Sequence, residues 1–232
     1  MIILGLDGLE YNYVLEFNCK NLMQESFGKT DISIFSMPKT VVIWSSFLAG
    51  KNLEAEILKQ DLWSFQLKPE DTFFSRFKKW VAIDVPGFTF SKENHEPERA
   101  VLKGFFDKKN TIDDYDKIAI ENHRRNKEAF LRALDEDHEI VMGYFAIADT
   151  IGHLSFGVKS KMRIIYGELE DLVSKAKKKG ATVLVVSDHG MSAVGRFGDH
   201  SNYGFWSINR KVELGTPKIT SFRQLIENDF RT

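Results

Sequence analysis

The stretch Ala181-Thr-Val-Leu-Val-Val-Ser-Asp-His-Gly-Met191 decides the fold class of this 232-residue chain. Its apolar run at 182–186 is rich in β-branched residues, which is typical of a strand that is buried on both faces. A charged segment with helical spacing, 159–179, comes just before it and ends at Gly180, a residue type that often terminates helices. A helix that leads into a buried strand is the repeating unit of layered α/β folds.

The same alternation extends away from this stretch. Apolar or alternating runs predict strands at 2–6, 30–35, 80–85 and 139–147. Helical spacing predicts helices at 73–79 and 112–134 and mixed helical structure at 9–25, whereas 41–48 fits either a helix or a buried strand. The polar composition of residues 86–110 predicts a loop or a small insertion. We therefore expect one α/β domain over 1–232, with a largely parallel central sheet flanked by helices.

Composition and charge limit the possible partners. Hydrophobic residues make up 43% of the chain, and 32 basic residues nearly balance 33 acidic ones. This balance favours neither a nucleic-acid polymer nor a membrane surface as partner. The single Cys excludes a disulfide within the chain and suits a reducing compartment. Because no apolar run approaches the roughly 20 residues of a membrane span and the first residues do not resemble a signal peptide, we expect a cytoplasmic protein.

Several common catalytic motifs are missing from the sequence. Gly28-Lys29-Thr30 resembles the end of a phosphate-binding loop, but Met23 stands where that motif requires glycine. No Gly-x-Gly-x-x-Gly follows the first predicted strand, and neither Gly-x-Ser-x-Gly nor His-Glu-x-x-His occurs. These absences disfavour nucleotide-loop, dinucleotide-binding, serine-hydrolase and zincin functions.

Aspartates follow three of the predicted strands. Asp7 comes after 2–6, Asp149 after the strand-like run at 139–147, and Asp188 after 182–186. In open α/β sheets, ligands bind beyond the carboxyl ends of the strands, so we expect these carboxylates to lie near one another. Taken singly, Asp7 has the alternative role of a turn former and Asp149 that of a helix cap.

Histidines accompany these aspartates. His153 lies four residues after Asp149, His189 is next to Asp188, and His200 follows Gly198-Asp199. A lone histidine at such a position is more often a hydrogen-bonded surface residue, so the hypothesis rests on the whole set. Carboxylate and imidazole are ligands for zinc and manganese, and six of them supply about three per metal for a two-metal phosphoryl-transfer site.

The segment after Pro38 offers a nucleophile. Thr40, Ser45 and Ser46 all carry hydroxyls, and Thr40 falls at an expected helix start. A helix N-terminus stabilises negative charge and therefore suits both an alkoxide and a substrate phosphate. The alternative role for Thr40 is that of a helix N-cap.

In order along the chain, these motifs resemble those of the alkaline phosphatase superfamily, and most closely its type I phosphodiesterase/nucleotide pyrophosphatase branch. The residues that carry the resemblance are Leu6-Asp7-Gly8, Pro38-Lys39-Thr40, Trp44-Ser45-Ser46 with Gly50, Asp149-Thr150-Ile151-Gly152-His153, Ser187 to Met191, and Gly198-Asp199-His200. The resemblance covers residues 2 to about 209 and implies an alkaline-phosphatase-like fold.

The resemblance also implies a division of roles. Asp149, His153 and His200 would bind one divalent metal ion, whereas the other ion would be bound by Asp7, Thr40, Asp188 and His189. Thr40 would attack phosphorus to form a covalent phospho-enzyme, and water activated by the first metal would release the product. Zinc is the expected metal, with manganese as the alternative. The implied substrate is a small-molecule phosphate ester, with diesters or nucleotide-type phosphoanhydrides preferred.

The sequence departs from the family pattern after the nucleophile. Many relatives carry a His-Gly and a phosphate-contacting Asn there, whereas this chain reads Ala49-Gly50-Lys51-Asn52. Asn52, Lys39 and Arg196 are candidate substrate contacts, although Lys39 also fits a solvated surface. Phosphomonoesterase, phosphonate hydrolase or phosphomutase activity on the same scaffold is the alternative function, and a non-catalytic metal-binding module is the alternative from another class.

Overall fold

Six strands form the central sheet of the computed structural model, which describes residues 1–229. The strands are β1 (Ile2–Leu6), β2 (Ser26–Asp31), β3 (Trp80–Ile83), β4 (Ile140–Phe145), β5 (Val183–Ser187) and β8 (Tyr203–Ile208). Their order is β2-β8-β5-β1-β4-β3. β5, β1, β4 and β3 pair in parallel, whereas β8 is antiparallel to both β5 and β2. The expected α/β fold with a largely parallel sheet is thereby confirmed.

Residues on the inner strands alternate between two apolar layers. Leu4 of β1 and Val185 of β5 pack on one side of the sheet, whereas Ile3 and Leu184 pack on the other. All four side chains are fully buried. This two-sided burial explains why these strands read as continuous apolar runs, as is usual in parallel sheets covered by helices on both faces.

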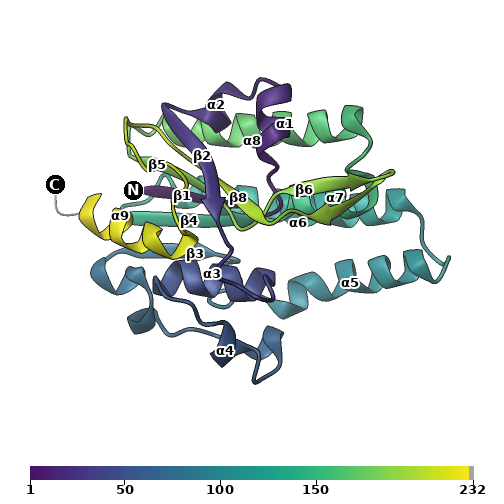
Figure 1. Cartoon of the computed structure of the whole chain (residues 1–232), viewed down its shortest axis with the longest axis horizontal. Helices are drawn as coiled ribbons and strands as arrows, with labels where there is room; N and C mark the ends of the chain where they lie inside the picture. The colour runs from purple at the N-terminus through teal and green to yellow at the C-terminus, as the bar shows by residue number, and fades with distance from the viewer. Residues whose placement is uncertain (230–232) are drawn as a thin grey trace.

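Helices cover both faces of the sheet. One face carries α1 (Tyr11–Glu16), α2 (Lys20–Met23), α6 (Ile112–Ala133), α7 (Ile147–Ser155) and α8 (Lys159–Lys177). The other carries α3 (Thr40–Ala49), α4 (Glu54–Ile57) and α9 (Phe222–Asp229), together with short 3-10 helices at Leu62–Ser64, Pro69–Asp71, Phe73–Arg76 and Ile219–Ser221. Figure 1 shows α1, α2 and α8 on one side of the sheet and α3 and α4 on the other. No helix within residues 1–229 combines the length and apolarity needed to cross a bilayer.

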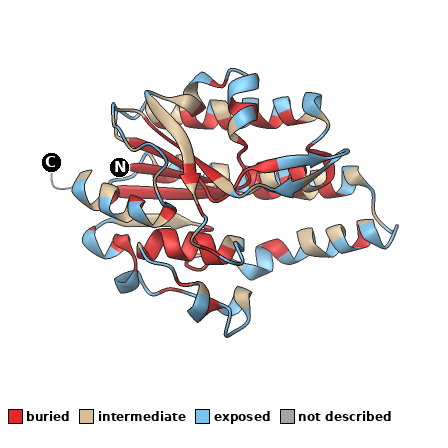
Figure 2. Cartoon of the chain, in the orientation of Figure 1, coloured by how far each residue is buried: buried red, intermediate tan, exposed pale blue. Residues whose placement is uncertain are grey.

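Helix α3 is the most deeply buried helix on the face of the sheet that carries α3, α4 and α9. Every residue from Val41 to Ala49 is buried, and α3 is almost entirely red in Figure 2. Its apolar surface therefore continues around the helix, as expected for a helix inside a core. This resolves the ambiguity at 41–48 in favour of a helix.

Two short elements differ from their predicted positions. The strand expected at 30–35 lies instead at Ser26–Asp31, because Ile32 and Phe35 enter the core from a turn rather than from a strand. The helix expected at 73–79 is a single 3-10 segment, Phe73–Arg76. Both sites are rich in apolar residues, and periodicity alone does not distinguish a buried turn from a regular element.

Of the loop or small insertion expected at 86–110, the loop is wrong for most of its length. Residues Lys92–Phe106 form helix α5, which packs along α6. Its polar composition and internal Pro97 hid the helical pattern, because only His95 and Gly104 are buried. Contact with α6 supplies the stabilisation that the intrinsic helix propensity lacks.

The reactivity of Cys19 tests whether its side chain is buried on the face of the sheet that carries α1 and α2. Burial, together with the nearby charge of Glu170, raises the pKa of its thiol to about 12, from an ordinary value of 9.0. Since alkylation requires the thiolate, we expect the folded protein at pH 8 to react with iodoacetamide about a thousandfold more slowly than the unfolded chain. Mass spectrometry with and without denaturant measures this ratio, and equal rates would contradict the buried placement.

Candidate active site

Three neighbouring strands bring the predicted aspartates together. Asp7 directly follows β1, and Asp188 directly follows β5. Asp149 lies in the first turn of α7, just after β4. Because β5, β1 and β4 are adjacent and parallel, their carboxyl ends meet at one edge of the sheet. The expected proximity of the three carboxylates follows from this topology.

A small hairpin brings the last histidine to the same edge. β6 (Met191–Val194) and β7 (Phe197–His200) form a separate two-stranded sheet. His200 ends β7, and its ring stacks on that of His189 with the centroids 3.7 Å apart. The sequence predicts no strand around His200, since the exposed strands of the hairpin lack an apolar face.

The six side chains divide into two groups that are each suited to a metal ion. Within each group, the candidate ligand atoms lie within 4.8 Å of one another. The two groups are Asp149, His153 and His200, and Asp7, Asp188 and His189. The family resemblance implies the same two groups of side chains, with Thr40 as an additional ligand in the second group.

Asp149 is the centre of the first group. Its Oδ2 lies 3.2 Å from His153 Nε2, and its Oδ1 lies 3.4 Å from His200 Nε2. In the second group, His189 Nε2 lies 3.2 Å from Asp7 Oδ1 and 3.6 Å from Asp188 Oδ2. The two groups are close together, since His189 Nε2 of the second group lies 3.8 Å from Asp149 Oδ1 of the first. The site is therefore compact enough for two ions to act on one phosphoryl group.

Buried polar atoms without partners point into this site. Asp7 Oδ1, Asp149 Oδ1, both Asp188 carboxylate oxygens and His189 Nε2 make no hydrogen bond among the described residues. Leaving such atoms unpaired in the interior is costly. His189 Nδ1 lies 3.0 Å from the carbonyl of Gly190, to which it can donate, and that tautomer leaves an Nε2 lone pair free to bind a cation. This donor set fits divalent cations.

The electrostatics of the site also favour bound cations. Burial and the neighbouring Asp7 raise the pKa of Asp188 well above its ordinary value. Burial opposes ionisation of Asp149 as well, but the neighbouring imidazoles of His153 and His200 lower its pKa. Burial lowers and Asp149 raises the pKa of His153, and the carboxylate prevails. Divalent cations at this point would balance the concentrated carboxylate charge without bound protons.

Thr40 lines the same cavity as most of these side chains. It is the first residue of α3, and Lys39 takes the N-cap position. The cavity has a volume of about 220 Å³ and is also lined by Asp7, Asp149, His153 and His200. Thr40 therefore lies at the start of a ten-residue helix and lines the same cavity as members of both ligand groups. The helix start favours an anion there.

Comparison with known proteins identifies the family. Residues 1–206 match the family model for type I phosphodiesterase/nucleotide pyrophosphatase. The chain belongs to this family. A search of curated proteins finds no significant match.

Solved structures share the fold at low sequence identity. Alkaline phosphatase from the Antarctic bacterium TAB5 is 13% identical with a TM-score of 0.57, and the match covers 99% of this chain and 97% of that one. Phosphonoacetate hydrolase from Sinorhizobium meliloti 1021, in complex with phosphonoacetate, is 14% identical with a TM-score of 0.51. That match covers 82% of this chain but only 56% of the hydrolase. At these identities the likeness shows the fold alone.

The three candidate substrate contacts lie outside this cavity. Lys39 is exposed at the N-cap of α3. Asn52 donates to the carbonyl of Ile34 and accepts from the backbone N–H of Glu54. Arg196 Nε donates to the carbonyl of Leu154 at 3.2 Å. Because the last two side chains have local backbone partners and none of the three lines the cavity, nothing in the geometry supports a substrate contact for them.

Tyr144 is a site residue that sequence reasoning missed. Its hydroxyl donates a short hydrogen bond to Asp7 Oδ2, and its side chain lines the cavity. Burial and the charge of Asp7 raise its pKa well above the ordinary value, so it stays a donor. The sequence feature that could have pointed to Tyr144 is its position near the carboxyl end of the strand predicted at 139–147.

Gly8 allows β1 and α7 to approach one another. Its φ is +67°, and a Cβ there would lie 2.8 Å from the Asp149 Cα. We expect Gly8→Ala to lower the free energy of unfolding by roughly 2–4 kcal/mol, from backbone strain together with overlap against α7. Gly180→Ala is the matched control, because Gly180 has φ +72° but no neighbouring atom within 4 Å of the position that the added methyl group would take.

Urea denaturation measures the free energy of unfolding of both glycine variants. Gly180→Ala should lower the free energy of unfolding by about 1 kcal/mol, because it introduces only the strain of a non-glycine residue in the left-handed conformation. Equal losses for the two variants would show that the close approach of Gly8 to Asp149 has no energetic consequence.

Proposed function

We propose that this protein is a metal-dependent hydrolase of small phosphate esters, of the phosphodiesterase/nucleotide pyrophosphatase type, with Thr40 as nucleophile. One observation carries the proposal. Two adjacent groups of carboxylates and imidazoles, with buried unpaired atoms, lie beside Thr40. Membership in the type I phosphodiesterase/nucleotide pyrophosphatase family supports the same chemistry.

The ligand groups would hold two divalent cations, zinc by preference and manganese as the alternative. Asp149, His153 and His200 would hold one ion, and Asp7, Asp188 and His189, together with Thr40, would hold the other. When bound, the ions would supply Lewis-acid activation of the phosphoryl group and of water.

Thr40 would perform the covalent step. Its Oγ forms a bond to phosphorus, the bond from phosphorus to the ester oxygen breaks, and the departing alcohol takes up a proton. Water then attacks phosphorus, the Oγ–phosphorus bond breaks, and Thr40 recovers its hydroxyl proton. The position of Thr40 at the start of α3 favours the negative charge that develops on its oxygen.

Tyr144 would act as a positioning residue. By donating to Asp7 Oδ2, it holds that carboxylate with Oδ1 facing the rest of the ligand group. An oriented carboxylate reduces the reorganisation that the site must undergo during the reaction.

Hydrolysis of chromogenic esters tests this function. The protein is stripped of metal, resupplied with zinc or manganese, and assayed on bis(4-nitrophenyl) phosphate and 4-nitrophenyl phosphate. We expect metal to restore cleavage of the diester by at least about a hundredfold, with the monoester cleaved more slowly. Faster monoester cleavage would move the function to a phosphatase or mutase, and no metal-dependent cleavage of either ester would contradict the proposal.

A further inference from the structure

The cavity beside Thr40 contains one basic side chain that the proposed chemistry does not use. Arg99, on α5, lines this cavity together with Thr40 and both ligand groups. It is the only lysine or arginine among the described residues that line it. Its guanidinium carbon lies 3.8 Å from the centre of the Trp63 ring and 6.0 Å from that of Phe90.

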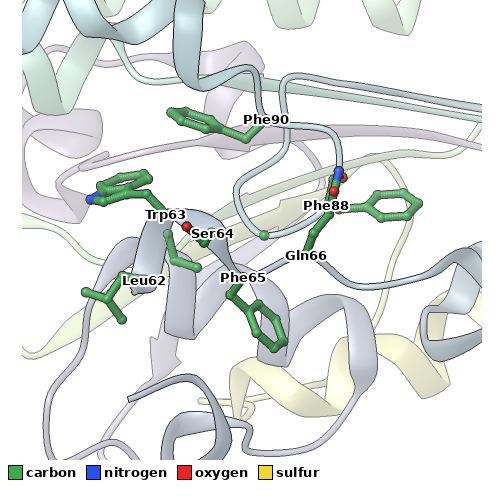
Figure 3. A pocket seen from close by; sticks show the side chains of 9 residues that line it. Leu62, Trp63, Ser64, Phe65, Gln66, Phe88 and Phe90 are labelled. Carbon is green, nitrogen blue, oxygen red and sulfur yellow. The ribbon is translucent and has the colours of Figure 1, made fainter. Parts of the chain in front are cut away.

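The aromatic stack beside Arg99 runs from the exposed Trp63 through Phe90 to the buried His95. The Trp63 and Phe90 rings are 5.3 Å apart, and Phe90 stacks on His95 at 4.2 Å. His95 Nε2 in turn lies 2.7 Å from the carboxylate of buried Asp84. Figure 3 shows Trp63 and Phe90 projecting from different chain segments at a smaller adjoining cavity, of about 70 Å³. The two rings therefore cover one face of the guanidinium.

No carboxylate in the described part of the chain forms an ion pair with Arg99. Among residues 1–229 its guanidinium has neither a salt bridge nor a hydrogen bond to another residue, and it stacks on the two aromatic rings instead. The adjacent Glu98 is engaged elsewhere, because it accepts from Asn122 Nδ2 at 3.0 Å and from Thr150 Oγ1 at 3.4 Å. Stacking leaves the N–H edge of the guanidinium available, and that edge matches a carboxylate or a phosphoryl group.

We propose that Arg99 binds a second anionic group of the substrate and thereby makes the enzyme selective for phosphate esters that carry a carboxylate or a further phosphoryl group. The inference rests on the proposed function, since the ligand groups and Thr40 engage the reacting phosphoryl group. The remaining titratable lining is dominated by carboxylates and histidines, so Arg99 is the place in this cavity where a second anion is attracted without a metal.

Three matched diesters test the selectivity. Each has a 4-nitrophenyl leaving group, and the second substituent is phenyl, 3-carboxyphenyl or 3-phosphonooxyphenyl. In the wild type we expect kcat/KM for at least one of the charged esters to exceed that for the phenyl ester by at least about tenfold, mainly through KM. The preferred charged ester identifies the anion. Arg99→Gln should abolish the preference.

Arg124→Gln is the matched control, because Arg124 is an exposed residue of α6 outside the cavity. It should keep the wild-type preference. If Arg99→Gln lowers kcat/KM for all three esters by the same factor, or if the wild type shows no preference, the proposal is overturned. Thermal unfolding of Arg99→Gln shows whether loss of the Trp63 stack also weakens the fold.

Binding without turnover separates this proposal from the proposed function. Zinc-loaded wild type and Arg99→Gln are titrated calorimetrically with methylenediphosphonate, which has two anionic groups, and with methylphosphonate, which has one. We expect the variant to lose at least about tenfold in affinity for methylenediphosphonate, with a much smaller change for methylphosphonate. That result without ester hydrolysis would count against the proposed function alone, and equal changes for the two ligands would overturn the role of Arg99.

Discussion

Replacing Thr40 with alanine is expected to lower kcat for diester hydrolysis by at least about three orders of magnitude. The variant lacks the oxygen that forms the covalent bond to phosphorus. The six carboxylate and imidazole ligands remain in place, so metal content should change little. Stopped-flow kinetics and elemental analysis of the same sample measure both quantities.

Thr40→Ser is the matched control for this variant. It keeps a hydroxyl at the first position of α3 and should retain activity within about tenfold of the wild type. Acid quenching of the wild type during diester turnover should trap on Thr40 a phosphoryl group that still carries the second ester substituent, detectable by mass spectrometry. Full activity of Thr40→Ala would overturn the nucleophile assignment, whatever its metal content.

Removing one ligand from either group is expected to reduce the number of tightly bound metal ions from two to one. His153→Ala removes a ligand of the first group, and Asp188→Ala removes one of the second. Each loss also removes the stabilisation that the missing ion provides, about 2.7 kcal/mol when the free ion is at a hundred times its dissociation constant. Turnover should fall by more than about a hundredfold in both variants.

His138→Ala is the matched control, because His138 lies outside both groups and contacts Glu136. It should bind two ions with an unchanged metal-dependent rise in Tm. Elemental analysis and thermal unfolding with and without zinc compare the three variants. If His153→Ala and Asp188→Ala each retain two ions, the side chains do not form the two proposed sites.

Much of the proposed ligand set could be predicted from the sequence because parallel strands impose a simple rule. The apolar runs before Asp7 and Asp188 are continuous, so they indicated buried strands, and the carboxyl ends of such strands share one edge of the sheet. Asp149 and His153 are four residues apart and face the same way once that segment is a helix. The division of these side chains between two metal ions came from the family resemblance.

The wall of the cavity could not be predicted in the same way. Arg99 and His95 lie on α5, whose apolar residues are too few to reveal the helix before its packing against α6 is known. Trp63 reaches the cavity from a 3-10 segment with no periodicity of its own. Such residues are placed by tertiary contacts between distant segments, which a single sequence does not record.

Anomalous scattering from crystals soaked in zinc would show whether the site holds two ions. We expect two peaks per chain at the edge of the sheet, one surrounded by Asp149, His153 and His200 and the other by Asp7, Asp188 and His189. The hydroxyl of Thr40 should lie beside the second of these peaks. A single peak, or peaks away from these side chains, would contradict the proposed two-ion site.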